Sequence, residues 1–164
     1  MDDLAAFPTG QDALMDKLRG YHEIWYDRGF KEPLAKFLPM TASLLSAPLG
    51  PAQRAALIRL LAGLPTTKVV GTVTDPLGRK GLSVDFGVEG HVLVYDRKPA
   101  KELPVYPRQI LDPGTGMMLA NVSYAARTAL GRTKDEAVTF AARDSESGWT
   151  AQRPAAQKGC RKVK

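Results

Sequence analysis

The acidic, histidine and tyrosine side chains are the first residues to test for catalytic chemistry. Asp85, His91 and Tyr95, followed by Asp96, lie on two adjoining valine-containing segments. If these segments pair as neighbouring antiparallel strands, directly opposite side chains come within about 5.5 Å, which suits general acid–base chemistry. The ordinary polar face of a sheet explains the same residues without catalysis. We therefore take Asp85, His91 and Tyr95 as the one candidate catalytic cluster and favour the structural interpretation.

Other reactive signatures are missing from the sequence. It contains no Gly-x-Ser-x-Gly elbow, and the glycine-containing turn over residues 75–81 lacks the ending and the following helix of a phosphate-binding loop. His22 and His91 are two histidines without the further, regularly spaced ligands that zinc requires. Cys160 is the only cysteine, so an internal disulfide is impossible. The sequence predicts no cofactor and no metal, and it leans against an enzyme.

Aromatic side chains in the N-terminal quarter of the chain indicate a different kind of site. They are Trp25, Tyr26, Phe30 and Phe37. Side chains of this kind line grooves that hold apolar ligands or partner peptides, and we expect such a groove between a helical layer and a sheet. The simpler interpretation, which we favour, places the aromatic rings in the core.

The segment 97–107 is a second candidate for a contact surface. It holds three prolines and four charged residues, a composition that does not suit a central strand. We expect it to be an exposed loop in which Leu103, Val105 and Tyr106 form a contact patch.

The elements that position these residues divide the chain into a helical part and a strand part. Apolar residues at three- and four-residue spacing predict a helix over residues 10–26 and a broken helical stretch over 34–45, interrupted by Pro39. A further helix is predicted from Pro51 to Gly63. Segments rich in β-branched residues then predict six strands, over residues 68–74, 82–86, 91–95, 108–111, 117–124 and 137–142.

The predicted strands are joined by short turns, which indicates antiparallel pairing. The turns over residues 75–81, 87–90 and 112–116 are too short for a parallel crossover. We predict an α+β fold with about three N-terminal helices packed on one face of a five- to six-stranded antiparallel meander. Val84 and Phe86 alternate with Ser83 and Asp85, so the other face of the sheet is expected to be wetted.

The distribution of charge argues against a nucleic-acid partner. The chain has 23 Lys and Arg against 17 Asp and Glu, but five of the basic residues lie in residues 151–164, where no acid occurs. Residues 1–150 are therefore predicted to be a single, nearly neutral α+β domain, and residues 151–164 a disordered basic tail. A neutral body lacks the positive field that binding to a phosphate backbone requires.

The sequence leaves the location and the oligomeric state open. No apolar run approaches the roughly 18 residues of a membrane span, and residues 1–10 lack the layout of a signal peptide. The chain is expected to be cytoplasmic if it is native as written. If it is a piece of a longer protein, it is expected to be extracytoplasmic or membrane-associated through a segment that this chain lacks.

Several blocks in the middle of the chain stand in a distinctive order. They are Pro51 with Arg54-Ala55-Ala56-Leu57, then Leu64-Pro65, then Val69-Val70-Gly71-Thr72-Val73-Thr74-Asp75 with Gly78-Arg79 and Gly81, and then Ile110-Leu111-Asp112-Pro113 with Thr115-Gly116 and Leu119. Ser147-Gly148-Trp149-Thr150 closes the series. Over about half of its length the chain thus resembles a family of uncharacterised actinobacterial proteins, many of them membrane-anchored with an alanine-rich ectodomain. The glycines, with Asp75 and Asp112, also have a plain reading as turn residues.

The resemblance implies an extracytoplasmic sensory or binding domain beside a transmembrane helix, without an established activity. The chain departs from that pattern in having no membrane segment and in carrying the segment 97–107, which looks inserted. We therefore predict a non-catalytic binding domain, associated with the cell envelope, that recognises a protein or a hydrophobic ligand. Its predicted contact residues are Trp25, Tyr26, Leu103, Val105 and Tyr106. The alternative is a small enzyme or carrier acting on an apolar substrate in a cavity between helices and sheet.

Overall fold

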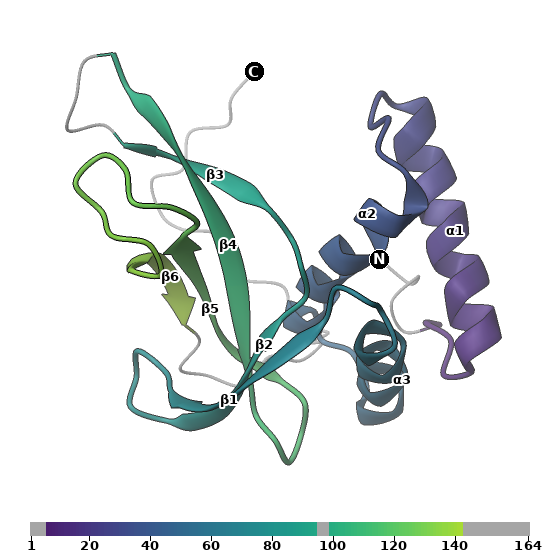
Figure 1. Cartoon of the computed structure of the whole chain (residues 1–164). Helices are drawn as coiled ribbons and strands as arrows, with labels where there is room; N and C mark the ends of the chain where they lie inside the picture. The colour runs from purple at the N-terminus through teal and green to yellow at the C-terminus, as the bar shows by residue number, and fades with distance from the viewer. Residues whose placement is uncertain (1–5, 95–98, 143–164) are drawn as a thin grey trace, which may run out of the picture.

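A computed structural model describes residues 6–94 and 99–142 of the chain (Figure 1). The helices come first: α1 (Gln11–Asp27), α2 (Leu34–Met40), the 3-10 helix η1 (Thr41–Ser46) and α3 (Pro51–Ala62). The strands follow: β1 (Lys68–Thr74), β2 (Lys80–Asp85), β3 (Gly90–Val94), β4 (Lys101–Leu111), β5 (Met118–Ala125) and β6 (Ala137–Ala142). The predicted α+β class with an antiparallel sheet is confirmed. No helix among the described residues is long and apolar enough to cross a bilayer.

Local sequence explains where the helices begin and end. Leu14 and Leu18, four residues apart, are fully buried on one face of α1. Pro51 occupies the first turn of α3, where a missing N–H removes no helical hydrogen bond. The break predicted at Pro39 falls instead at Thr41, where α2 passes into η1 and the Thr41 hydroxyl donates to the Leu38 carbonyl oxygen over 2.6 Å. Pro39 itself lies within the last turn of α2.

The order of the strands corrects the predicted meander at β3. The order is β1-β2-β4-β5-β6, and β3 pairs with β4 rather than with β2. Both β2 and β3 run antiparallel to β4, opposite residues 108–111 and 101–105 respectively. Residues 87–90 therefore do not reverse the chain as predicted. Gly87, at a φ of +74°, bends the chain there, and its N–H donates to Asp85 Oδ1 over 2.8 Å.

The prediction of an exposed loop over residues 97–107 is wrong for the part that the structure describes from Lys101 onward. Residues 101–107 are the first part of β4, the strand that pairs with β2, β3 and β5. Leu103 and Val105 are buried, so they do not form an exposed contact patch. Pro107 lies between the part of β4 that pairs with β3 and the part that pairs with β2. Its missing N–H therefore removes no hydrogen bond to either of these strands.

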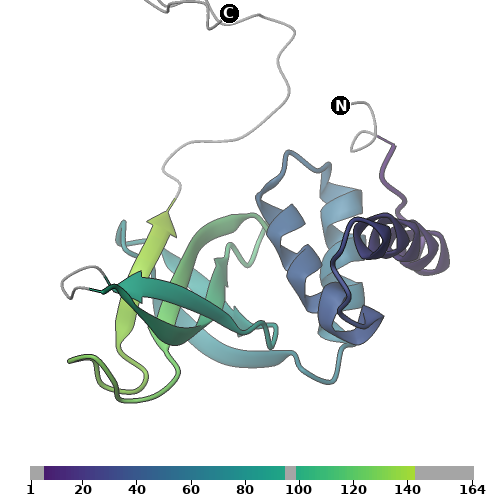
Figure 2. The same cartoon turned by 90° about the horizontal axis from the view of Figure 1, so that it is seen from above.

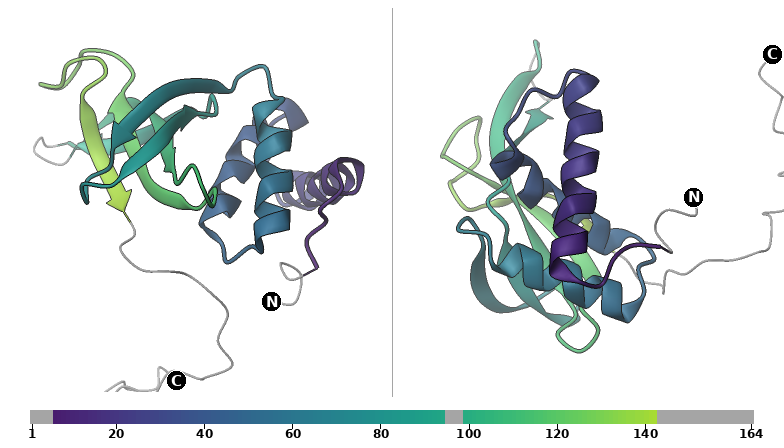
Figure 3. Two further views of the ribbon diagram at one scale, coloured as in Figure 1. Left: turned by 90° about the horizontal axis from the view of Figure 1, so that it is seen from below. Right: turned by 90° about the vertical axis from the view of Figure 1, so that its right-hand side faces the viewer.

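The helices lie to one side of the sheet and share one apolar core with it (Figures 1 and 3). Leu57 and Leu61 of α3 belong to the same buried cluster as Val84, Phe86 and Leu111 of the sheet region. Val84 and Phe86 are on the helix-facing side, as their alternation with polar residues predicted.

The other side of the sheet, which we call the inner face, is only partly wetted. Ser83, expected on solvent, is 2% exposed. Ile110, Ala120 and Val122 form a second buried cluster on this face, packed against side chains that include Val73 of β1 and Ala142 of β6. The sheet therefore curls toward its inner face (Figure 2) and covers part of a surface that a flat meander would expose to water.

Two glycine substitutions test this packing. A Cβ atom on Gly81 would lie 2.5 Å from Ile110 Cγ2 and 3.0 Å from the Leu111 carbonyl oxygen. Gly81→Ala should therefore lower the free energy of unfolding by about 1 to 3 kcal/mol in urea titrations. The matched control is Gly20→Ala in α1, where an added Cβ meets no atom within 4 Å. That variant should gain about 0.5 to 1 kcal/mol. Equal effects of the two variants would contradict the packing of β2 against β4.

Candidate functional site

An apolar groove of about 280 Å³ opens within the helical layer. Its walls come from α1, α2, η1 and the segment that joins α1 to α2, and no residue of the sheet lines it. The lining residues are Leu18, Tyr21, Trp25, Phe30, Phe37, Met40, Thr41, Ser43 and Leu44. The prediction of an aromatic groove is thus met in its composition but not in its place, because the groove lies between helices and not between helices and sheet.

Helical spacing and one tight turn build the groove. Trp25 follows Leu18 and Tyr21 at seven and four residues, which places all three on one face of α1. Gly29, at a φ of +107°, lets the chain turn back after α1, and the Phe30 ring then packs edge-on against Phe37 with ring centroids 6.3 Å apart. The Trp25 side chain is 56% exposed at the rim of the groove.

Tyr26, the other aromatic contact residue predicted on α1, points away from the groove. Successive helix residues are about 100° apart, so the neighbour of Trp25 does not share its face. The Tyr26 ring lies beneath Lys31, whose Nζ is 4.1 Å from the ring centroid and donates to the Tyr26 carbonyl oxygen over 2.7 Å. His22, on the same turn, donates through Nε2 to the Glu32 carbonyl oxygen over 2.8 Å. His22 of α1 therefore stabilises the segment that connects α1 to α2.

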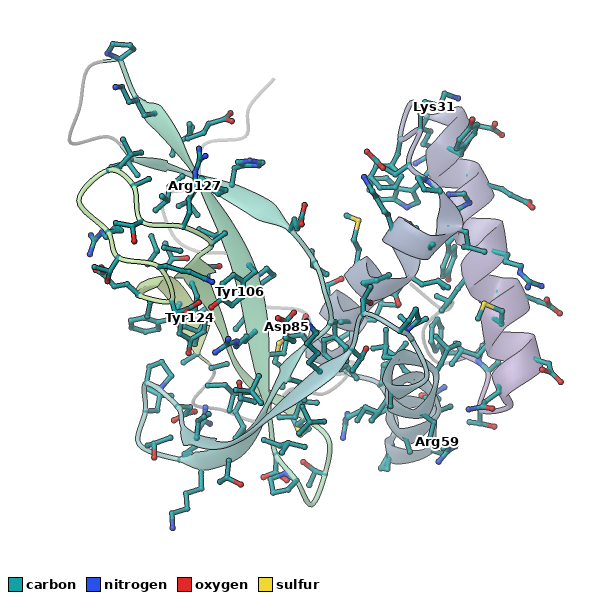
Figure 4. All side chains as sticks on the ribbon, viewed as in Figure 1. Lys31, Arg59, Asp85, Tyr106, Tyr124 and Arg127 are labelled. Atoms are coloured by element: carbon teal, nitrogen blue, oxygen red, sulfur yellow. The ribbon has the colours of Figure 1, made fainter. Side chains whose placement is uncertain are left out.

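Tyr106 joins a polar aromatic cluster on the inner face of the sheet. Its ring stacks on Tyr124 of β5, with centroids 5.7 Å apart and planes 18° from parallel. The Arg108 guanidinium lies 4.9 Å from the Tyr106 ring centroid and 4.8 Å from that of Tyr124. The Tyr106 hydroxyl donates to Asp135 Oδ1 over 2.5 Å. Figure 4 shows the labelled side chains of Tyr106, Tyr124 and Asp85 grouped beside β4.

The cluster perturbs the acid–base chemistry of Tyr106. Burial of the hydroxyl and its hydrogen bond to the Asp135 carboxylate raise the pKa of Tyr106 to about 12, against an opposing effect of the Arg108 charge. The buried Arg108 Nε has no hydrogen-bond partner among the described residues. Two carboxylates, Asp85 and Asp135, act on Tyr106 from the same surroundings, so the cluster has no excess of positive charge that would attract an anion.

The structure does not bring the candidate catalytic residues together. Asp85 stands opposite Arg108, whereas His91 stands opposite Pro104. These partners are four residues apart on β4, which corresponds to about 13 Å. Tyr95 and Asp96 lie outside the described residues. His91 instead lines an open cleft of about 550 Å³ with residues that include Glu89, Glu102, Tyr106 and Arg127.

The residues of the two Asp-Pro turns have structural partners. Asp75 Oδ1 accepts the N–H groups of Leu77 and Arg79, over 2.9 and 2.8 Å. Burial acts to raise the pKa of Asp75, but these bonds and the Arg79 guanidinium outweigh it and hold the pKa below its usual value. Asp112 accepts the N–H groups of Gly114 and Thr115 in the same way. The interpretation of both aspartates as turn residues is confirmed.

Within residues 6–94 and 99–142, no group of three or more His, Cys, Asp and Glu side chains is arranged to hold a metal ion. Comparisons with models of protein families, with curated proteins and with solved structures find no match to this chain. The candidate sites therefore rest on the geometry of the chain itself.

Sequence reasoning missed the partners of Tyr106. Arg108 follows Tyr106 by two residues, a spacing that puts both side chains on one face of a strand. That signal was hidden because residues 101–107 read as a proline-rich loop. Tyr124 and Asp135 are 18 and 29 residues away in the chain and become neighbours only through the pairing of β4 with β5 and the connection to β6.

The raised pKa of Tyr106 predicts a distinct alkaline transition. Tyrosine in the unfolded chain ionises near pH 10, so the contribution of Tyr106 to stability is complete below about pH 10 and is lost as the pH rises to about 12. Across this window the wild-type chain should lose about 1 to 2 kcal/mol more unfolding free energy than Tyr106→Phe, after allowance for solvent screening. Tyr124→Phe is the control and should behave as the wild type. Parallel pH profiles for the wild type and Tyr106→Phe would contradict the cluster.

Proposed function

We propose that this chain is a non-catalytic binding domain that receives an apolar group of a partner in the groove of its helical layer. The observation that carries the proposal is the combination of an aromatic lining with an exposed rim. Trp25 is 56% exposed and Met40 44% exposed, although both border an apolar cavity. Exposed aromatic and methionine side chains around a pocket are typical of surfaces that become buried in a complex.

The size of the groove favours a protein partner over a free small molecule. Pockets for drug-sized ligands usually measure about 300 to 1,000 Å³, and this groove of about 280 Å³ lies just below that range. One or two apolar side chains of a partner segment fit such a volume, as when an amphipathic helix lays its anchors into a groove. A hydrophobic ligand of similar size is the second occupant consistent with the lining.

The lining also supports binding rather than catalysis. The nine lining residues include no histidine, carboxylate, amine, guanidinium or thiol. The hydroxyl groups of Tyr21, Thr41 and Ser43 border the cavity, but a hydroxyl needs an adjacent base to become a strong nucleophile, and the lining supplies none. The alternative of a small enzyme acting on an apolar substrate therefore gains no support from the groove, whereas a carrier remains compatible with it.

A sensory role at the cell envelope is the context that we propose for this binding. It is supported by the order of the sequence blocks from Pro51 to Leu119, which resembles that of membrane-anchored domains. A protein partner that signals through such a domain needs a docking surface on the folded body, and the groove offers one on the helices.

Groove binding can be measured with Trp25 as the reporter. The chain has two tryptophans, so Trp149→Phe leaves Trp25 as the only one. In that background the apolar probe 1-anilinonaphthalene-8-sulfonate should bind at one site, shift the Trp25 emission and accept energy from it. Phe37→Ala should remove the aromatic wall and weaken probe binding about tenfold or more.

The matched control is Phe140→Ala, which removes an exposed aromatic side chain of β6 outside the groove. This variant should bind the probe as the parent does. Far-ultraviolet circular dichroism of each variant checks that the fold is kept. Equal loss in both variants, or no energy transfer from Trp25, would reject the groove as the binding site.

The envelope context makes a separate prediction. In cells of the source organism, the native protein should be recovered with the membrane or extracytoplasmic fraction when lysates are probed with an antibody against the folded domain. A cytoplasmic enzyme should mark the soluble fraction as a control. Recovery of the native protein only with that marker would reject the envelope role and would leave the groove proposal standing.

A further inference from the structure

The edge of the sheet formed by β6 is unusually bare. Within residues 6–94 and 99–142, β5 is the one strand that pairs with β6, and no described strand lies along its other edge. Its sequence, Ala-Val-Thr-Phe-Ala-Ala, contains no charge and no proline. Most of its residues are exposed, and the Phe140 side chain is 65% exposed. Soluble proteins usually protect an edge of this kind with charges, proline or a bulge that twists it away, because it is a template for another strand.

The opposite edge, β1, shows what such protection looks like in this fold. Lys68 opens the strand, and the register with β2 shifts between Val69 and Gly71. Gly71 has a φ of +133°, which breaks the regular extended backbone. β6 likewise skips one residue, Val138, against β5, but residues 139–142 continue in regular register and the strand contains no charge and no glycine. The two edges therefore differ in their capacity to accept a further strand.

We infer that β6 pairs antiparallel with β6 of a second copy of this chain, with the two-fold axis at Phe140. The two sheets keep their inner faces on the same side only if each residue pairs with one whose side chain points to the same face. Because neighbouring residues point to opposite faces, the two-fold axis perpendicular to the sheet must pass through a residue position and not between two residues. At Phe140 this axis places the two Phe140 rings directly opposite each other. Aromatic cross-strand pairs are among the stabilising ones in sheets.

The charge pattern favours a second copy over an unrelated strand. In a symmetric pair, β6 of one copy lies opposite β6 of the other. A charged residue near the two-fold axis would therefore lie close to the same charge in the second copy. With the axis at Phe140, residues 138–142 pair only with one another, and all five are uncharged. The pairing also covers the exposed Phe140 side chain. The buried area of one strand edge is small, so we expect a weak dimer in equilibrium with the monomer.

Cysteine cross-linking tests the axis directly. In a Cys160→Ser chain, which has no other cysteine, Phe140→Cys should form a disulfide-linked dimer under mild oxidation, because directly opposite Cβ atoms about 4.5 to 5.5 Å apart need only a small shift to reach the roughly 3.5 to 4.5 Å of a disulfide. Val69→Cys in the same background is the matched control, since Val69 is 66% exposed on the other edge. It should cross-link at least tenfold more slowly.

Sedimentation equilibrium of the full chain, from about 1 µM to 1 mM, tests association without a cross-link. The wild type should show a monomer–dimer equilibrium, and Phe140→Lys, which opposes two ammonium groups, should shift it at least tenfold toward monomer. A wild-type chain that stays monomeric, or a dimer that Phe140→Lys leaves intact, would overturn the inference. So would dimerisation that appears only when the chain is cut after Ala142, because the following residues would then occupy the edge.

Discussion

The packing of α3 on β2 is the contact on which the rest of the structure depends. Leu57 and Leu61 belong to one buried cluster with Val84 of β2 and with Phe86, which follows that strand. Arg54 of α3 adds hydrogen bonds at the border of this contact. It is 8% exposed, and its guanidinium donates to the Leu49 carbonyl oxygen over 2.7 Å and to that of Thr115 over 2.8 Å. A buried cation held by two carbonyls from distant segments ties α3 to the hairpin between β4 and β5.

The attachment of the helices to the sheet through α3 explains where the groove lies. The helices meet the sheet near α3, and the far half of α1 extends beyond that contact (Figure 1). Trp25 and Phe30 therefore line a groove whose other walls come from α1, α2 and η1, and no residue of the sheet lines it. The helical layer therefore has exposed apolar side chains around the groove, whereas its buried leucines pack in the core.

The sheet illustrates how one long strand organises the other features. β4 pairs with β2 and β3 along one edge and with β5 along the other, so it carries both the buried Leu103 and Val105 and, on its inner face, Tyr106 and Arg108. The pairing of β6 with β5 brings Asp135, in the connection before β6, to the Tyr106 hydroxyl. The tyrosine cluster is a consequence of this arrangement.

The sequence by itself determined the types of the elements and most of their limits. The signals that determined them act between residues close together in the chain, so the sequence contains all of each signal. They are the apolar spacing in α1, the proline at the start of α3 and the two Asp-Pro turns. Only the tertiary structure decided that β3 pairs with β4, that Leu103 and Val105 are buried, and that Tyr26 and Trp25 face different surroundings. Strand pairing joins residues far apart in the chain, so the sequence alone contained no sign that residues 101–107, rich in proline, are paired with β3 and β5.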